Sequence, residues 1–596
     1  MRSLGIALGL ALLAGLVCTF IYRQVVHYAE PLGEMPEGAP SVGPAPQSSG
    51  TEWALFWGSE CSLSRTGHLA VLRAVGKPHT LGACHGRLLG HAVTDETAPL
   101  AAVILAAIAE SGFLDGVRRG PRLRWRLRLL DDGTPPAQLQ EIAGVVHGIE
   151  RGGSGQAPAF ETLVRVQAAL DIGAPAGVSP GAAYGAVARS LSFVLTGAGA
   201  AVPAPSAKAA GSTSGLRPGS TGSAATGSAP ASPRLLVGRS FSLFGAEDGG
   251  DRAASAPLVS LVRPDGSIPY ASVGWPGLIG AVSGVNAEGI AVLVHPAAAN
   301  DVRQTRVAQP LALLARDMLE HAHTLDEAVR MVERAPPLGA AGFLVVDGRR
   351  RRLAWIERSP SRSRVVRDAS PAVEGDFFTT EPFAPERASE RARRMRPSTD
   401  RVARALELVR RAPPGGVEQA VAVLRDAARP DGTPLPPGHR GAIDDPEAAH
   451  TLVIDPVELV LWVADGPGAG ARFRAFDLRR ELRGEPTRPV PPADVPADDQ
   501  RDPGAASDVV EARRELRAAR EARRAGDVER ARELCARALI RRPDLPEALL
   551  LAGDLARTAG DRDAAQRFYR RLLEVGSDGP EGEEEVRAHL GMQPAR

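Results

Sequence analysis

The chain has 596 residues, of which 44% are hydrophobic, so it is long enough for several domains with sizeable cores. Its 71 lysines and arginines balance 70 aspartates and glutamates, and the resulting charge of +1 argues against a nucleic-acid partner, which requires a strong positive field. The four cysteines lack close spacing, so we expect neither a disulfide framework nor a Cys-x-x-Cys metal site. We find no motif for a metal or a cofactor.

The N-terminus carries an uncharged apolar stretch at residues 4–22, LGIALGLALLAGLVCTFIY. About 20 apolar residues span a bilayer as a helix. The following RQVVHYAEP is a poor cleavage site for a signal peptidase. We therefore expect residues 1–25 to form an uncleaved single-pass membrane anchor, with the body on the outer, periplasmic or extracytoplasmic side. Residues 26–49 are rich in proline and glycine and predict a spacer.

The long region 50–484 mixes helical and β-rich patterns, which indicates an α/β or α+β domain. Helices are expected at 96–111, 136–149, 308–335, 399–411 and 416–427. Strands are expected at 190–198, 234–243, 258–263, 288–295, 341–347, 352–358 and 451–464. The Gly/Ser/Ala/Pro-rich stretch 201–233 cannot bury enough apolar surface to order itself, so it predicts a disordered insert in a hairpin.

The C-terminal region follows a Pro- and Asp-rich segment at 485–508, which predicts a linker to a helical tail at 509–596. Within residues 509–578 small and packing residues recur after 34 positions; Gly526 and Ala531, for example, reappear as Gly560 and Ala565. That period is similar to tetratricopeptide repeats, although a plain helical hairpin is the alternative. Two units are fewer than such repeats need, so we expect them to pack on the main domain or on a protein partner. We also expect the tail to be separable.

A family resemblance covers most of residues 65–470. Residues 274–296, GWPGLIGAVSGVNAEGIAVLVHP, resemble the acyl-coenzyme A:6-aminopenicillanic-acid acyltransferase family, which is related to the choloylglycine hydrolases. Residues 76–91, 138–148, 323–357 and 451–467 resemble further segments of that family in the same order. The resemblance implies an α+β fold, a four-layer αββα sandwich of the N-terminal-nucleophile hydrolase type, with the all-α helical-repeat tail added. It also implies an amide or acyl substrate.

The family's catalytic positions are largely substituted in this chain. Its Cys-Thr-Ser-Phe aligns with residues 190–193, so Ser190 takes the place of the nucleophile. Within GRSFS at 238–242, Arg239 matches the family's arginine, whereas Ser242 replaces its aspartate. Thr380 stands where an oxyanion-binding asparagine is expected. The resemblance further implies that Arg401 is a retained arginine and that His295 lines the substrate site. The implied catalytic residues are therefore Ser190, Arg239 and Arg401, and the implied substrate-binding residues are His295, Thr380 and Ser242.

The sequence contains two other candidate nucleophiles. Cys84 is adjacent to His85, but neighbouring residues on one helix or strand point apart, so the pair cannot share a proton. The stretch 211–214, Gly-Ser-Thr-Ser, resembles the lost cysteine motif but lies in low-complexity sequence.

Three functions stay open. The chain is a serine-dependent amide hydrolase or acyltransferase, an inactive relative that binds a small amide or acyl ligand, or a scaffold whose tail recruits a protein. Whether it is an enzyme is therefore uncertain from the sequence.

Overall fold

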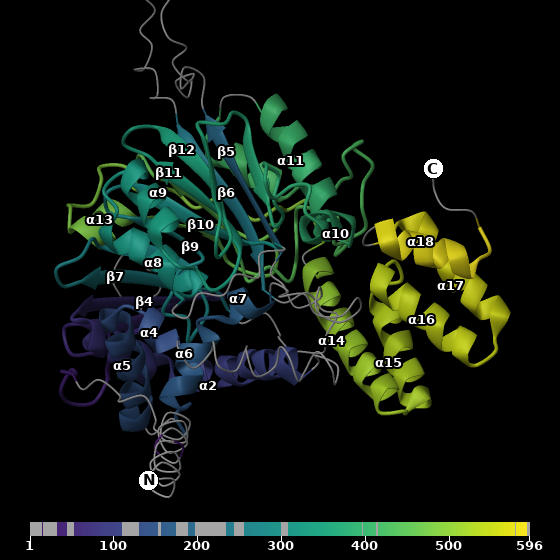
Figure 1. Ribbon diagram of the computed structural model, residues 1–596, viewed down its shortest axis with the longest axis horizontal. Helices are drawn as coiled ribbons and strands as arrows, with labels where there is room; N and C mark the ends of the chain where they lie inside the picture. The colour runs from purple at the N-terminus through teal and green to yellow at the C-terminus, as the bar shows by residue number, and fades with distance from the viewer. Residues whose placement is uncertain are drawn as a thin grey trace, which may run out of the picture.

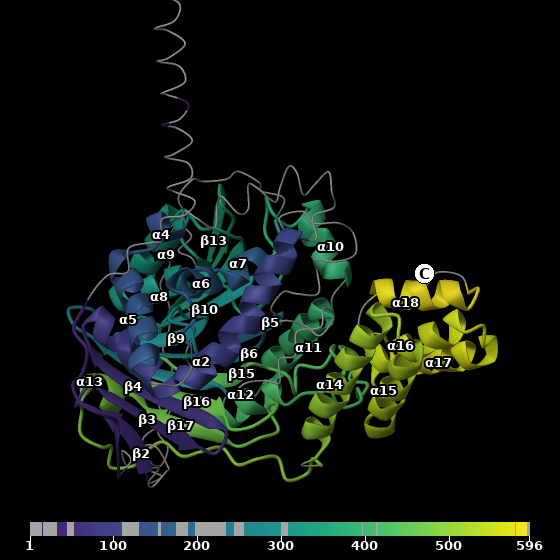
Figure 2. The same ribbon diagram turned by 90° about the horizontal axis from the view of Figure 1, so that it is seen from below.

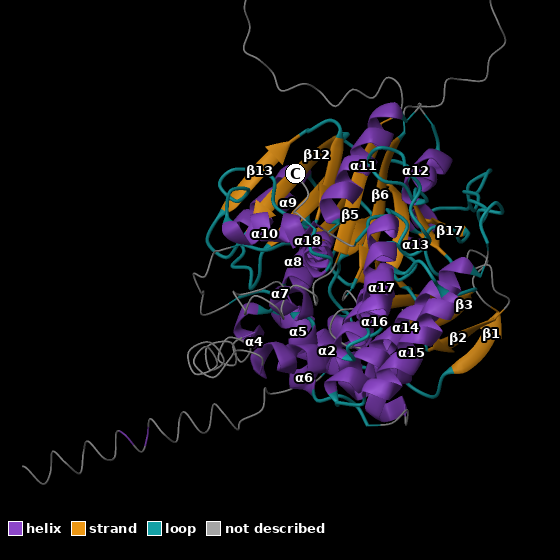
Figure 3. Cartoon of the chain, turned by 90° about the vertical axis from the view of Figure 1, so that its right-hand side faces the viewer, coloured by secondary structure: helices purple, strands orange, loops and turns teal. Residues whose placement is uncertain are grey.

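The computed structural model describes Leu13, Gly15 and residues 33–44, 53–109, 130–152, 156–173, 189–196, 234–243, 256–299, 308–395, 397–412, 415–502, 504–577 and 580–592. Two β-sheets lie face to face, with helices on the outer face of each, and a helical tail lies at one side (Figures 1 and 3). The predicted four-layer αββα sandwich is confirmed.

The larger sheet has 11 strands in the order β1-β2-β3-β4-β7-β8-β9-β10-β11-β12-β13. Their bounds are β1 Ser41–Pro44, β2 Trp53–Trp57, β3 Cys61–Thr66, β4 Leu69–Gly76, β7 Leu258–Pro264, β8 Tyr270–Gly274, β9 Ser283–Asn286, β10 Ile290–Pro296, β11 Ala341–Asp347, β12 Arg352–Arg358 and β13 Ser363–Arg367. The β4–β7 ladder is parallel, and it joins the N-terminal strands to the family-like segment.

The smaller sheet has six strands in the order β14-β5-β6-β15-β16-β17. Their bounds are β5 Arg189–Thr196, β6 Leu235–Ser242, β14 Ala372–Gly375, β15 His450–Asp455, β16 Val460–Ala464 and β17 Phe473–Asp477. Because side chains alternate along a strand, each strand of this sheet serves two cores. Val194, Val237 and Leu452 face the larger sheet, whereas Leu191 and Leu236 face helices on the other side.

Helices α2 (Pro78–Ala109), α4 (Leu130–Gly133), α5 (Pro136–Gly152), α6 (Phe160–Val166), α7 (Ala169–Gly173), α8 (Leu311–His321) and α9 (Leu325–Arg334) lie over the larger sheet. Glycines bring α2 and α5 into close contact: a Cβ at Gly86 would lie 2.0 Å from the backbone oxygen of Val145, and one at Gly144 would lie 2.1 Å from that of His79. The glycines within the family-like segments 76–91 and 138–148 therefore serve the close packing of these two helices.

On the opposite side, α11 (Ser398–Arg411) and α12 (Val417–Leu424) cover the smaller sheet, and α10 (Arg387–Met395) precedes them. The short α13 (Leu478–Arg483) follows β17. Beyond it, Val495 forms a bridge with Phe473, and the indole of Trp462 donates to the carbonyl of Ala493 at 2.9 Å. Part of the segment expected as a linker is therefore packed against the sheet.

The tail consists of α14 (Ala505–Arg524), α15 (Val528–Arg541), α16 (Pro546–Thr558), α17 (Arg562–Val575) and α18 (Pro580–His589), and α14 lies beside the sandwich (Figure 2). The 34-residue spacing has a structural counterpart. Asp527 caps α15 and Asp561 caps α17, each by accepting from a backbone N–H three residues later. The tetratricopeptide name for this pattern stays a prediction.

Each helix and strand expected in the main region has a counterpart in the structure, and two of them are divided. The helix expected at 308–335 is two helices, because the side chain of Thr324 accepts from the N–H of Glu327 and starts α9 anew. The strand expected at 451–464 is the hairpin β15–β16. Its turn is held by Asp455, whose carboxylate accepts from the N–H groups of Val457 and Glu458. The insert at 201–233 lies outside the described residues.

The structure contradicts the predicted single-pass membrane anchor. Among the residues that the structure describes, no helix is both long enough and apolar enough to cross a bilayer. Apart from Leu13 and Gly15, residues 4–22 lie outside the described part. The long α2 carries Arg87, Asp95 and Glu96, and it belongs to the core. Within the expected spacer, residues 41–44 form β1, which pairs with β2.

The structure contains a disulfide that the cysteine spacing did not indicate. Cys61 on β3 and Cys84 on α2 are bonded, with their Cα atoms 5.4 Å apart. Both are buried, and Cys84 is therefore no nucleophile in this state. The bond attaches the first long helix to the sheet beneath it.

Breaking this disulfide should destabilise the protein. Cross-linking two residues that are 23 positions apart restricts the unfolded chain, which is worth about 3 kcal/mol. Cys84→Ser should therefore lower the denaturant midpoint, and reductant should do the same to the wild type but not to the variant. Equal midpoints for the wild type with and without reductant would show that the bond contributes nothing.

Candidate active site

Strand pairing brings Ser190 and Arg239 to the same face of the smaller sheet. In the β5–β6 ladder Ser190 lies opposite Phe241, and Ser192 lies opposite Arg239. Opposite residues of an antiparallel pair share a face. That face looks toward the larger sheet, because Val194 and Val237 of the same alternation belong to the core between the sheets. Arg239 donates from Nη1 to the hydroxyl of Ser192 at 3.0 Å.

His295 reaches this pair from the other sheet. It lies on β10; its Nδ1 is 2.9 Å from Ser190 Oγ, and its Nε2 is 2.7 Å from Nη1 of Arg239. A guanidinium has only N–H donors, so Nε2 must be the acceptor in the second contact. A neutral imidazole that accepts at Nε2 carries its proton on Nδ1. His295 therefore donates to Ser190 Oγ and cannot receive the hydroxyl proton there.

The charge of this group follows from its surroundings. Burial and the neighbouring charge of Arg239 hold the pKa of His295 well below its usual range, while a hydrogen bond to the backbone of Gly375 acts in the opposite direction. Burial lowers the pKa of Arg239 to about 9, which leaves the guanidinium protonated at neutral pH. The site thus holds one fixed cation and one neutral histidine.

The hydrogen-bond donors of Thr380 are already bound to a carboxylate. Glu357 on β12 accepts from the N–H and hydroxyl groups of both Thr379 and Thr380, at distances of 2.5 to 3.2 Å. The indole N–H of Trp355 adds a further bond to Glu357 at 3.1 Å, and Trp355 meets His295 edge-on. Donors that bind a carboxylate are not available to a developing oxyanion. In this state Thr380 therefore does not act as the missing asparagine.

Ser242 and Arg401 lie on the other side of the smaller sheet. Ser242 is opposite Arg189 in the ladder, and both contact Asp445: the Ser242 hydroxyl at 2.5 Å and Arg189 Nη2 at 2.9 Å. Arg401 on α11 makes long bonds of 3.4 Å to the Ser240 hydroxyl and to the carbonyl of Ile443. Burial lowers the pKa of Arg401, and Asp445 opposes this effect.

The structure therefore divides the six predicted site residues. Ser190, Arg239 and His295 meet between the sheets, Thr380 adjoins them only through Glu357 and Trp355, and Ser242 and Arg401 face the helices. Two functional carboxylates were missed. Asp445 lies 256 and 203 residues from Arg189 and Ser242 in the sequence, and Glu357 lies 22 and 23 residues from Thr379 and Thr380. Neither carboxylate belongs to a motif that sequence reasoning would detect.

The meeting point is closed to solvent. Ser190 is 2% exposed, and Arg239 and His295 are 0% exposed. Burial, with the charge of Glu357, raises the pKa of the nearby half-buried Glu374 to about 8. A cavity of about 290 Å³ lies elsewhere, at the far end of β5, where Thr196, Pro371 and Arg410 line it.

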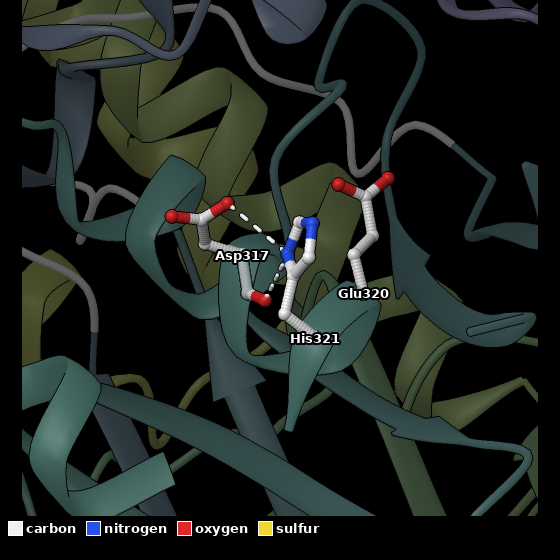
Figure 4. Close-up of side chains that lie close together, drawn as sticks. All are labelled: Asp317, Glu320 and His321. Carbon is white, nitrogen blue, oxygen red and sulfur yellow. Dashed lines mark hydrogen bonds and ion pairs between the residues drawn. The ribbon is translucent and has the colours of Figure 1, made fainter. Parts of the chain in front are cut away.

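One group of side chains on α8 has the composition of a metal site. Asp317, Glu320 and His321 lie close together, and Figure 4 shows Asp317 bonded to His321. However, Glu320 accepts from Arg316 at 2.9 and 3.0 Å. A guanidinium on the same carboxylate competes with a metal ion. These residues therefore belong to an ion-pair cluster that also includes Glu141.

A comparison with models of protein families finds a match within the sandwich. Residues 255–455 match the family model described as acyl-coenzyme A:6-aminopenicillanic acid acyl-transferase. This part of the chain is similar to that family. The predicted resemblance is thereby confirmed from β7 to β15, which includes His295, Thr380 and Arg401. Ser190, Arg239 and Ser242 precede the matched residues.

Solved structures and curated sequences add little. A Caenorhabditis elegans N-acylethanolamine-hydrolyzing acid amidase ortholog is 15% identical, with a TM-score of 0.26, over 38% of this chain and 90% of its own. A mutant conjugated bile acid hydrolase from Clostridium perfringens is 9% identical, with a TM-score of 0.27, over 42% and 90%. Scores this low decide nothing alone. No curated protein matches the chain.

Buried neutral histidines should make the protein sensitive to acid. Burial is the main cause that lowers the pKa of His85, to about 4, and that holds those of His295 and His450 well below the usual range. The unfolded chain, with histidine pKa values near 6.5, binds these protons first. The contribution of these histidines to the free energy of unfolding is therefore fully present above about pH 6.5. It decreases as the pH falls below that value, by about 2 kcal/mol per histidine at pH 5.

Urea midpoints at pH 7 and pH 5 measure this loss. His450→Gln should reduce the difference between the two pH values, and the same substitution at the exposed His321 is the matched control. Identical pH dependence in His450→Gln and the wild type would rule out this contribution of His450.

Proposed function

We propose that this chain is a non-hydrolysing relative of the amide-hydrolysing and acyl-transferring enzymes that it resembles. In that family the resemblance implies that the nucleophile becomes the first residue of a processed chain, and we propose that this chain is not cut between Arg189 and Ser190. The observation that carries the proposal is the hydrogen bond from Arg239 to His295. It leaves His295 as a donor to Ser190, whereas activation of a serine requires a base that accepts the hydroxyl proton.

Three further features support the proposal. Arg189 and Ser190 both belong to the β5–β6 ladder, so the bond that would be cut is part of a continuous strand. Thr380, in place of the oxyanion asparagine, donates to Glu357. Loss of one oxyanion donor typically costs about 100- to 1000-fold in rate. Finally, Ser190, Arg239 and His295 are almost completely buried, which disfavours the binding of an amide or acyl ligand at this point.

Under this proposal the sandwich is a support for the helical tail, which would be the part that meets a protein partner. Helix α15 carries Ile540, which is 81% exposed, whereas α14 contacts the sandwich through Arg513 and Arg517. The tail thus has one docked side and one side directed to solvent.

The intact mass of the purified chain tests the proposal. We expect one species of 62.4 kDa for the full chain, with the same uncut mass pattern for the wild type, Ser190→Ala and Ser190→Cys. Ser190→Cys matters because a thiol is a better nucleophile, yet His295 would still be unable to act as its base.

Incubation with a fatty-acyl 4-nitroanilide gives the second readout. We expect the wild type to release nitroaniline no faster than Ser190→Ala does. A stoichiometric cut before Ser190, accompanied by hydrolysis that Ser190→Ala abolishes, would make Ser190 a true nucleophile and refute the proposal.

A further inference from the structure

The carboxylate of Asp445 connects the strands that carry Ser190 to the helical tail. On one side it accepts from Arg189 and Ser242, at 2.9 and 2.5 Å. On the other side it faces Nη1 of Arg513, at 3.9 Å, on α14 of the tail. All four side chains are buried. Asp445 is thus shared between the first residue of β5, the last residue of β6 and the tail.

Arg513 is itself held from several directions. Its Nη1 pairs with Glu447 at 2.8 Å, its Nε pairs with Glu547 at 3.1 Å, and its Nη2 donates to the carbonyl of Gly438 at 2.5 Å. Glu447 also binds Arg517, at 3.1 Å. Arg513 therefore ties the segment 438–447 to both α14 and α16, so displacement of the tail would move that segment.

The electrostatics make the connection strong. Burial alone would raise the pKa of Asp445, but the guanidinium groups of Arg189, Arg513 and Arg401 hold that pKa far below its usual range. Among the described residues, Nε and Nη1 of Arg189 make no hydrogen bond. Asp445 is consequently the group that fixes this buried cation. Removing one partner of a buried ion pair leaves an uncompensated charge, which is strongly destabilising.

We propose that the docked tail locks the start of strand β5: Arg513 holds Asp445, and Asp445 holds Arg189 and Ser242 where the β5–β6 ladder begins. Separating the strands at Ser190 would require breaking the contacts of Asp445. By reciprocity, any ligand that draws α14 away from the sandwich would loosen this part of the ladder. The lock is a conformational device, and it does not depend on whether Ser190 is a nucleophile.

Hydrogen exchange of backbone amides, measured by mass spectrometry on the full chain, tests the lock. In Arg513→Met, peptides that cover 189–196 and 235–243 should exchange at least about fivefold faster than in the wild type, the lower end of usual coupling between sites. Peptides that cover β10 and β11 should be unchanged. Arg514→Met is the matched control, because Arg514 is the next residue on α14 and pairs with Glu511 at the surface.

Asp445→Asn probes the lock from the other end. It should accelerate exchange in β5 and β6 and also in α14, and combining it with Arg513→Met should add little to the effect on β5. It serves as the second variant should Arg513→Met fail to fold. Faster exchange confined to the tail in Arg513→Met, or confined to β5 and β6 in Asp445→Asn, would refute the coupling. This result is independent of the intact mass, so the lock and the lack of turnover can fail separately.

Discussion

The hydrogen bond from Arg239 to His295 determines what the centre of this sandwich can do. Arg239 is completely buried, and its guanidinium can only donate. It therefore fixes the proton of His295 on the nitrogen that faces Ser190. A Ser-His pair at 2.9 Å would suggest a nucleophile and its base, but the third group reverses the direction of the hydrogen bond. In serine hydrolases that third group is a carboxylate, which accepts from the histidine and leaves the other nitrogen free to take a proton.

The buried charges around the site are rearranged rather than removed. The resemblance places an aspartate at position 242, where this chain has serine. The structure brings Asp445 to the hydroxyl of that serine, so a carboxylate is still present next to β6 but comes from a loop. It lies on the helix side of the sheet, whereas Ser190 lies on the side between the sheets. The carboxylate of Asp445 therefore compensates the positive charges of Arg189 and Arg513.

The sequence predicted elements well where one pattern persisted. Strands β10, β11 and β12 are fully apolar in their centres, and α5 has a clear helical period, so their positions agree with the expected ranges. The four N-terminal strands β1 to β4 were missed; they are short, with four to eight residues each. The division of the site was open to prediction: Arg239 and Ser242 are three residues apart on one strand, so they must point to opposite faces. The contacts of Asp445 could not be predicted from the sequence, because they link residues up to 256 positions apart.

The contacts of Asp445 and Arg513 make the tail and the sandwich depend on each other. Arg513 is wholly buried between Glu447 and Glu547, and its removal would take one cation from each of these carboxylates and from Asp445. Without the tail, Glu447 would lose both Arg513 and Arg517, whereas Asp445 would keep Arg189 but lose the nearby charge of Arg513. The residue before Ser190 therefore depends on a helix more than 300 residues later in the chain. The separability of the tail stays a prediction, and an interface built from buried ion pairs stabilises both sides only while they are together.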